Sequence, residues 1–194
     1  MHAVGVDWVR GRPAETIASP DLVLTRLSAT DVPALVLAVN ESLDHLRPWM
    51  AWASEPATAE TMSAFVSHAE DCWWLGTEFL YAVRRPPSPA LVAGCGLHVR
   101  RGPGVLEIGY WVHVAHVRRG IATALAATLT REALELPSVD RVEIRCDASN
   151  TRSAAVPARL GFTLEGVDHL PPDEAGQRHS HMIWGLNRGQ PLSM

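Results

Sequence analysis

The sequence predicts a single α/β domain, with helices on both faces of a mixed, mostly antiparallel sheet of six to seven strands. Three observations support this prediction: seven strand-like segments are interspersed with helical ones, no segment repeats another, and 194 residues fit one domain of ordinary size. A chain of this length can bury a full hydrophobic core. A mixed sheet is expected because some neighbouring strands are joined by short loops and others by helices.

The N-terminal part begins irregularly and then contains one strand and one helix. Residues 1–20 mix small, polar, Gly and Pro residues without a sustained period. They predict a loosely ordered arm that precedes a domain over residues 21–194. Residues 21–26 alternate well enough for a first strand, and a helix with Pro33 in its first turn follows.

A long helix and a pair of strands occupy the middle of the chain. Residues 58–75 have the apolar spacing of a helix, which Gly76 ends. Residues 78–84 and 91–99 are the next two strands. The loop between them contains three prolines, which cannot continue either ladder, so these strands are expected to pair antiparallel.

The segment over residues 105–136 organises the rest of the chain. It opens with β-branched and aromatic residues typical of a strand, over residues 105–112, and passes through a short turn into an alanine-rich helix that starts near Gly120. A strand, a short helix and two further strands are predicted over residues 141–147, 151–160, 162–167 and 179–186.

The turn between that strand and helix predicts an anion site. A helix start leaves backbone N–H groups without partners, and here they lie beside Arg118 and Arg119. Gly120 and Ala122 keep the approach open, and Thr123 can add a hydroxyl. Two cations and a row of donors suit a diphosphate. The alternative is an ordinary glycine-containing helix start with solvated arginines.

Two segments resemble the GNAT (GCN5-related) N-acetyltransferase family. The strand, the turn, Arg-Arg-Gly-x-Ala and the alanine-rich helix resemble its acyl-CoA-binding motif. Residues 150–166 are similar to the signature N-x-x-S-x-x-V-x-x-[KR]-L-G-F-x-x-E-G of its RimL-like branch. That branch acetylates N-terminal amines of ribosomal proteins and includes enzymes for other amines. The resemblance covers about residues 22–186, with one departure: Val117 stands where the family has Gln or Arg.

The resemblance implies an N-acyltransferase that moves an acetyl group from acetyl-CoA to a primary amine by direct attack in a ternary complex. The acceptor is a protein N-terminus or a small-molecule amine. Two alternatives remain open: a larger acyl donor such as succinyl-CoA, for which Arg100 or Arg101 near the acyl pocket would be a sign, and a catalytically silent CoA-binding regulatory module. Dimers are common among relatives, so a homodimer is possible.

The resemblance also implies which residues hold the cofactor. Backbone groups near Trp111, Val112 and Val114 are expected to pair with the pantetheine arm and the acyl oxygen, while Asn150 caps a helix and contacts pantetheine. The diphosphate is expected at the helix start. The implied cofactor-binding set is Trp111, Val112, Val114, Val117, Arg118, Arg119, Gly120, Ile121, Ala122, Thr123, Asn150 and Ser153.

Two catalytic side chains follow from the same resemblance. Glu107 lies thirteen residues before Gly120, close to where histone-type relatives carry their base. Ser153 matches the branch's candidate acid, since the tyrosine of many other relatives would fall at Pro157. Each has a structural alternative. Glu107 could be a solvated charge on the face of a strand, and Ser153 a residue that satisfies the start of a helix. In the loop that follows, Asp173 and Glu174 are a further candidate base or solvated acids.

Three aromatic residues are candidates for the acceptor pocket. Pro48 ends a helical segment and leaves Trp49 and Trp52 on a short loop. In RimL-like enzymes this region resembles the wall of the acceptor pocket, and Tyr110 on the organising strand is expected to face it. The alternative is that these tryptophans close the core, as large aromatic residues usually do.

Composition excludes several other classes of protein. A net charge of −4 and a pI near 6.1 argue against a general nucleic-acid or membrane surface. Three widely spaced cysteines predict reduced, buried thiols, and the N-terminus lacks a signal pattern, so a cytoplasmic protein is expected. The pairs His113/His116 and His179/His181 lack a catalytic-zinc pattern, so no metal is expected.

Overall fold

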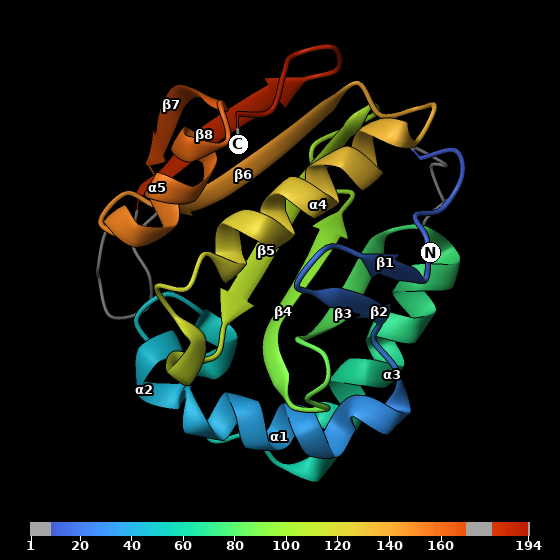
Figure 1. Ribbon diagram of the computed structural model, residues 1–194, viewed down its shortest axis with the longest axis vertical. Coiled ribbons are helices and arrows are strands. Elements are labelled where there is room, and N and C mark those ends of the chain that lie inside the picture. Colours follow the sequence, from blue (N-terminus) through green and yellow to red (C-terminus); the bar gives the residue numbers. More distant parts are fainter. Residues whose placement is uncertain (1–8, 170–179, 194) are drawn as a thin grey trace.

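The computed structural model describes residues 9–169 and 180–193, and within them the chain forms one sheet flanked by helices (Figure 1). The helices are α1 (Val32–Glu41), α2 (Leu43–Leu46), α3 (Ala59–Leu75), α4 (Ile121–Glu135) and α5 (Thr151–Arg159). The strands are β1 (Thr16–Ala18), β2 (Val23–Arg26), β3 (Glu78–Arg84), β4 (Leu91–His98), β5 (Val105–Val112), β6 (Arg141–Asp147), β7 (Thr163–His169) and β8 (Ser180–Asn187).

The sheet confirms the predicted fold class with one more strand than expected. Its described strands lie in the order β1-β2-β3-β4-β5-β6-β8-β7. The β5–β6 pair is parallel and the other neighbouring pairs are antiparallel. The sheet is therefore mixed and mostly antiparallel, and it has eight strands in place of six to seven.

The predicted loose arm over residues 1–20 is wrong for residues 9–20. β1 pairs with β2, Val9 is buried, and the backbone N–H of Ala14 donates to the Glu132 carboxylate on α4. A three-residue strand between prolines has too short a pattern to recognise, and its partners are distant in sequence. Residues 1–8 lie outside the described part.

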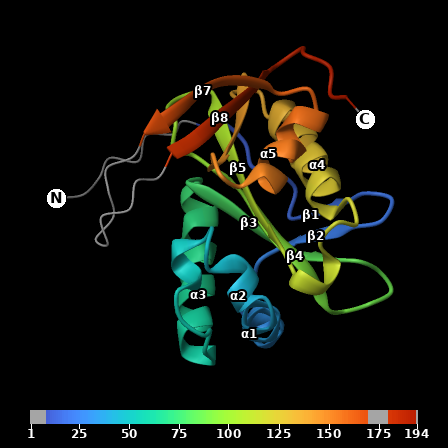
Figure 2. The ribbon, with the colours of Figure 1, turned by 90° about the vertical axis from the view of Figure 1, so that its left-hand side faces the viewer.

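Helices cover both faces of the sheet (Figure 2). α4 and α5 pack on one face, against β4, β5 and β6, while α1 and α3 pack on the other face against β3 and β4. Local signals explain the helix ends. Thr58 accepts a bond from the Thr61 N–H at the start of α3, and Gly76 ends α3 in the left-handed conformation. None of the helices described is long and apolar enough to cross a membrane.

The feature that positions the site is a gap between β5 and β6. Their parallel ladder runs from Val105 and Arg141 to Ile108 and Ile144, and stops there in the part of the chain that the structure describes. β6 continues to Asp147 in register with β8. Both strands continue beyond this point without pairing. Backbone groups at the end of β5 therefore face the gap.

Candidate functional site

The loop between β5 and α4 forms a concave array of donors. Arg118 and Gly120 both have left-handed backbone, with φ of 63° and 76°. The first helical bond of α4 runs from the Ala124 N–H to the Gly120 carbonyl, so the N–H groups of residues 121–123 have no partner within the helix. A left-handed non-glycine residue costs about 1 kcal/mol or more, and such strain concentrates at binding loops. Successive N–H groups in this conformation make an anion-binding nest.

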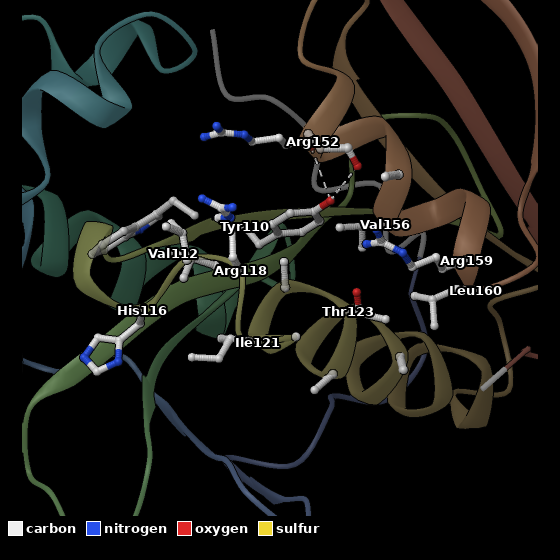
Figure 3. A pocket seen from close by; sticks show the side chains of 18 of the residues that line it. Tyr110, Val112, His116, Arg118, Ile121, Thr123, Arg152, Val156, Arg159 and Leu160 are labelled. Atoms are coloured by element: carbon white, nitrogen blue, oxygen red, sulfur yellow. Dashed lines mark hydrogen bonds between the residues drawn. The ribbon is translucent and has the colours of Figure 1, made fainter.

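A cavity of about 1180 Å³ opens in front of this loop, between α4, α5 and the end of β5 (Figure 3). Its walls include Arg118 from the loop and Arg152 and Arg159 from α5. It is also lined by most of the predicted cofactor residues, namely Trp111, Val112, Val117, Arg118, Gly120, Ile121, Ala122, Thr123, Asn150 and Ser153.

The two α5 arginines line this cavity but were not among the predicted cofactor residues. Arg152 and Arg159 are seven residues apart, which on a helix is close to two turns and puts them on one face. That spacing was a readable signal. With Arg118 they give the cavity a strongly cationic wall, which suits a ligand with several phosphate charges.

Two predicted cofactor residues do not line this cavity. The Val114 N–H donates to the Ser42 hydroxyl oxygen at 3.1 Å, so it is not available to pantetheine. Arg119 is exposed and lies outside the lining. Sequence could not show either result, because Ser42 lies seventy-two residues before Val114 and side-chain direction in the turn depends on the backbone of Arg118.

The backbone groups that face the gap are those of Tyr110 and Val112. The His113 N–H donates to the Val92 carbonyl, and bonded pairs alternate along an antiparallel ladder. Trp111, in register with Gly94, is therefore bonded to β4. The prediction that the Trp111 backbone is free for pantetheine is thus wrong; the free groups are those of its two neighbours, and Trp111 itself lines the cavity.

A half-buried pair of hydroxyl groups lies at the gap. The Tyr110 hydroxyl lies 3.3 Å from Ser153 Oγ, and the Asn150 amide oxygen accepts the Ser153 N–H at the start of α5 (Figure 3). Burial raises the pKa of Tyr110 to about 12, so the phenol stays protonated near neutral pH. Burial also raises the pKa of the neighbouring Cys146 thiol. The gap therefore contains a tyrosine hydroxyl, that of Tyr110, although Pro157 stands where many other relatives carry their tyrosine.

A second cavity, of about 580 Å³, lies on the α1/α3 face of the sheet. Trp52, Phe65 and the glycines of β4 line it, and so does Glu107. The two cavities meet, because six residues line both: Trp49, Met50, Tyr110, Trp111, Asn150 and Ser153. This junction brings together the loop after α2, the end of β5 and the start of α5.

Glu107 does not lie at the junction. It lines the second cavity but not the first, three residues before Tyr110 on β5. Its carboxylate accepts a 2.7 Å bond from Arg101 Nε and lies 3.7 Å from Arg100 and 4.0 Å from Arg145. The residue is buried, so the cluster is an ion-pair network inside the sheet face, which sequence reasoning did not find.

The tryptophans are not core residues. Trp49 and Trp52 are 39% and 51% exposed, so the alternative that they close the core is wrong. Trp52 stands edge-on to Trp111, with ring centroids 6.3 Å apart. Both predicted tryptophans line the second cavity, and Trp49 also lines the first.

The remaining candidates add no catalytic group to the described site. Asp173, Glu174 and His179 lie outside the described residues. His113 bonds to the Glu41 carboxylate at 2.8 Å, and burial lowers the pKa of His116. Within residues 9–169 and 180–193, no group of three potential ligands could hold a metal ion.

A model of the acetyltransferase (GNAT) domain matches residues 21–163, well over half of the chain. The chain belongs to the GNAT acetyltransferases. The predicted resemblance is confirmed, and with it the class of enzyme, an acyl-CoA-dependent transferase with acetyl-CoA as co-substrate.

Individual GNAT proteins show the same relationship. YdaF of Bacillus subtilis (strain 168), named as a candidate ribosomal N-acetyltransferase, is 26% identical over 171 residues, 85% of this chain and 90% of its own. RimL, the ribosomal L7/L12 α-N-protein acetyltransferase solved with coenzyme A, superposes with a TM-score of 0.78 at 24% identity, over 89% of this chain and 98% of its own.

A third GNAT structure has the same fold. The microcin C7 self-immunity acetyltransferase MccE, solved with acetyl-CoA and AMP, superposes with a TM-score of 0.78 at 20% identity, over 87% of this chain and 93% of its own. At such identities the likeness extends to the fold, and the fold alone does not assign the acceptor.

Proposed function

We propose that the protein transfers an acetyl group from acetyl-CoA to a primary amine by direct attack in a ternary complex. The observation that carries the proposal is the meeting of two cavities at the gap between β5 and β6, beside Tyr110 and Ser153. A donor and an acceptor can enter from opposite faces of the sheet and meet there without a covalent enzyme intermediate.

The first cavity suits coenzyme A. The nest at residues 118–123 faces a diphosphate, and Arg152 and Arg159 add positive charge for the further phosphate of the cofactor. The pantetheine arm then runs along the gap. It takes the place of the missing strand partner and bonds to the backbone groups of Tyr110 and Val112. Val117, which departs from the family motif, is compensated by donors that come from the backbone.

The junction supplies the chemistry of acyl transfer. The amine nitrogen attacks the thioester carbon, the C–N bond forms, and a backbone N–H in the gap stabilises the oxyanion. The C–S bond then breaks, and the leaving sulfur takes a proton from the Ser153–Tyr110 hydroxyl pair, whose half-buried phenol is still protonated at neutral pH. The attacking nitrogen loses its surplus proton to water in the second cavity, and water returns a proton to the hydroxyl pair.

Glu107 is better placed to hold the sheet face than to take the amine proton. Three residues of extended strand separate it from Tyr110, roughly 10 Å at about 3.4 Å each. Its carboxylate is engaged by Arg101 at 2.7 Å. This assignment differs from the sequence-based hypothesis of a catalytic base and is tested below.

Acetyl is the donor group that the charges favour. A carboxylated donor such as succinyl-CoA needs a cation for its distal carboxylate. The two arginines expected to mark such a donor already bind protein carboxylates: Arg100 lies 3.1 Å from Glu78, and Arg101 lies 2.7 Å from Glu107.

Thermal unfolding with coenzyme A, acetyl-CoA, succinyl-CoA and ADP tests the proposal. A ligand at 100 times its Kd adds about 2.7 kcal/mol to the folded state, which is roughly 5 to 11 °C for a chain of this size. Acetyl-CoA and coenzyme A should give this shift and ADP a smaller one. Amine-dependent release of the thiol completes the test. Binding without release would instead indicate a silent CoA-binding module, and no shift would refute the site.

A further inference from the structure

We infer that the acceptor is a small primary amine that carries an aromatic ring about two carbons from its nitrogen. This inference rests on the proposed function and deepens it by naming the class of acceptor. It is based on the wall, the floor and the charges of the second cavity. A protein N-terminus, a polyamine and an aminated sugar are the competing acceptors.

The wall presents aromatic rings to solvent. Trp49, Trp52 and Phe65 are 39%, 51% and 43% exposed, and all three line this one cavity. Exposed apolar surface gathered at one opening usually marks a binding site. By contrast, Trp74 on α3 is exposed but lies outside both cavities. Its ring contacts the guanidinium of Arg26, 5.0 Å from the ring centroid.

The floor holds another aromatic ring flat against the sheet. A Cβ atom at Gly94 would lie 2.4 Å from the Trp111 indole nitrogen, so only glycine lets this ring rest on β4. Trp111 forms a T-shaped pair with Trp52, and its partly buried ring lines the cavity beside the core cluster of α1 and α3. A flat ring placed there can stack on Trp111 and meet Trp52 edge to face.

The carboxylates that line the cavity are engaged within the protein. Glu107 and Glu78 bind Arg101 and Arg100, and Asp147 accepts bonds from the backbone N–H and the hydroxyl of Ser149. A polyamine or aminated sugar would need carboxylates to receive its several positive charges. The carboxylates of the cavity already bind protein groups, so they do not receive these charges. An aromatic acceptor instead meets a large apolar surface.

Size and position complete the fit. A volume of about 580 Å³ is within the range of small-molecule pockets. Trp111, Tyr110 and Ser153 all line the junction of the two cavities, although successive strand residues point to opposite faces of the sheet. A chain of about two carbons is the link that we propose between a ring on Trp111 and an amine at this junction.

Paired acceptors test the inference. 2-Phenylethylamine and 2-cyclohexylethylamine share an amine, a chain and a similar bulk, and differ in the flat ring. Aromatic pairs contribute a factor of roughly 2 to 12 each beyond buried area. We expect kcat/KM to favour the aromatic amine by at least about fivefold, and to favour it over spermidine and over a peptide with N-terminal serine.

Two variants locate the preference. Trp52→Leu, at an exposed position that should not affect folding, is expected to reduce the aromatic preference to less than about twofold. Trp74→Leu removes an equally exposed tryptophan outside the cavity and should keep it. Equal use of the two amines, or better use of spermidine or the peptide, with thiol release intact would overturn the inference and leave the proposed function standing. Thiol release with none of them would contradict both.

Discussion

Replacing Glu107 by glutamine distinguishes a structural carboxylate from a catalytic base. Glu107 is buried and binds Arg101 at 2.7 Å, with Arg100 and Arg145 within 4.0 Å. Glutamine has the same shape but carries no charge, and its amide group would direct donors at the arginines. The substitution therefore removes the ion pairs and leaves the volume of the site unchanged.

The expected loss of stability follows from these contacts. A hydrogen bond to a charged group contributes about 1.5 to 3 kcal/mol. The side chains of Arg101 and Arg100 are 35% and 48% exposed and can turn to water in the variant, so the lower half of that range applies. We expect a loss of about 1.5 to 2 kcal/mol, which lowers Tm by roughly 3 to 8 °C. Because Glu107 lies away from the junction, kcat should stay within about threefold of the wild type.

Thermal unfolding and amine-dependent thiol release, both measured between pH 6 and 9, test this expectation. Glu165→Gln is the matched control, since Glu165 also binds an arginine, Arg141, but lines neither cavity and is more exposed. It should lower Tm by less and leave kcat unchanged. A fall in kcat of about 100-fold for Glu107→Gln with an unchanged Tm would refute the reasoning and identify Glu107 as the base.

Three further expectations follow from the site and the sheet. Ser153→Ala should lower kcat by about 100-fold, and Tyr110→Phe by less, with the affinity for coenzyme A retained in calorimetry because neither change touches the phosphates. Gly120→Ala forces a side chain to φ 76° and should lose about 1 to 2 kcal/mol in chemical unfolding and weaken coenzyme A binding. A hydrogen bond with His98, and then the charges of His98 and Arg100, lower the pKa of Glu78 from 4.5 to about 2. A lowered pKa stabilises the folded state above pH 4.5 and ceases to do so as pH falls towards 2, so the stability advantage of wild type over Glu78→Gln in pH-dependent melts should vanish over that window.

Sequence reasoning succeeded where a feature depends on neighbouring residues. β6 begins and ends where its alternating pattern predicted, at Arg141 and Asp147. Asn150 caps α5 as predicted, because its side chain needs only the N–H three residues on. The left-handed backbone at Gly120 was likewise readable, since glycine at a helix start adopts it without strain.

It failed where a feature depends on residues far apart in the chain. Ser42 reaches Val114 across seventy-two residues and occupies an N–H that was expected to bind pantetheine. β1 was missed because pairing with β2 makes it a strand. Its own three residues carry no pattern that predicts one. No local pattern reports such pairings, which depend on how the elements pack.

By itself the sequence determined the family, the start of α4 near Gly120, and the residue types available for acyl transfer. Only the tertiary structure decided which of them act together. The gap between β5 and β6 leaves the backbone of Tyr110 without a partner strand on that side, and the packing of α5 brings Ser153 to its hydroxyl. The physical reason is that composition and spacing act within one element, whereas hydrogen bonds and ion pairs between elements depend on the register and splay of the whole sheet.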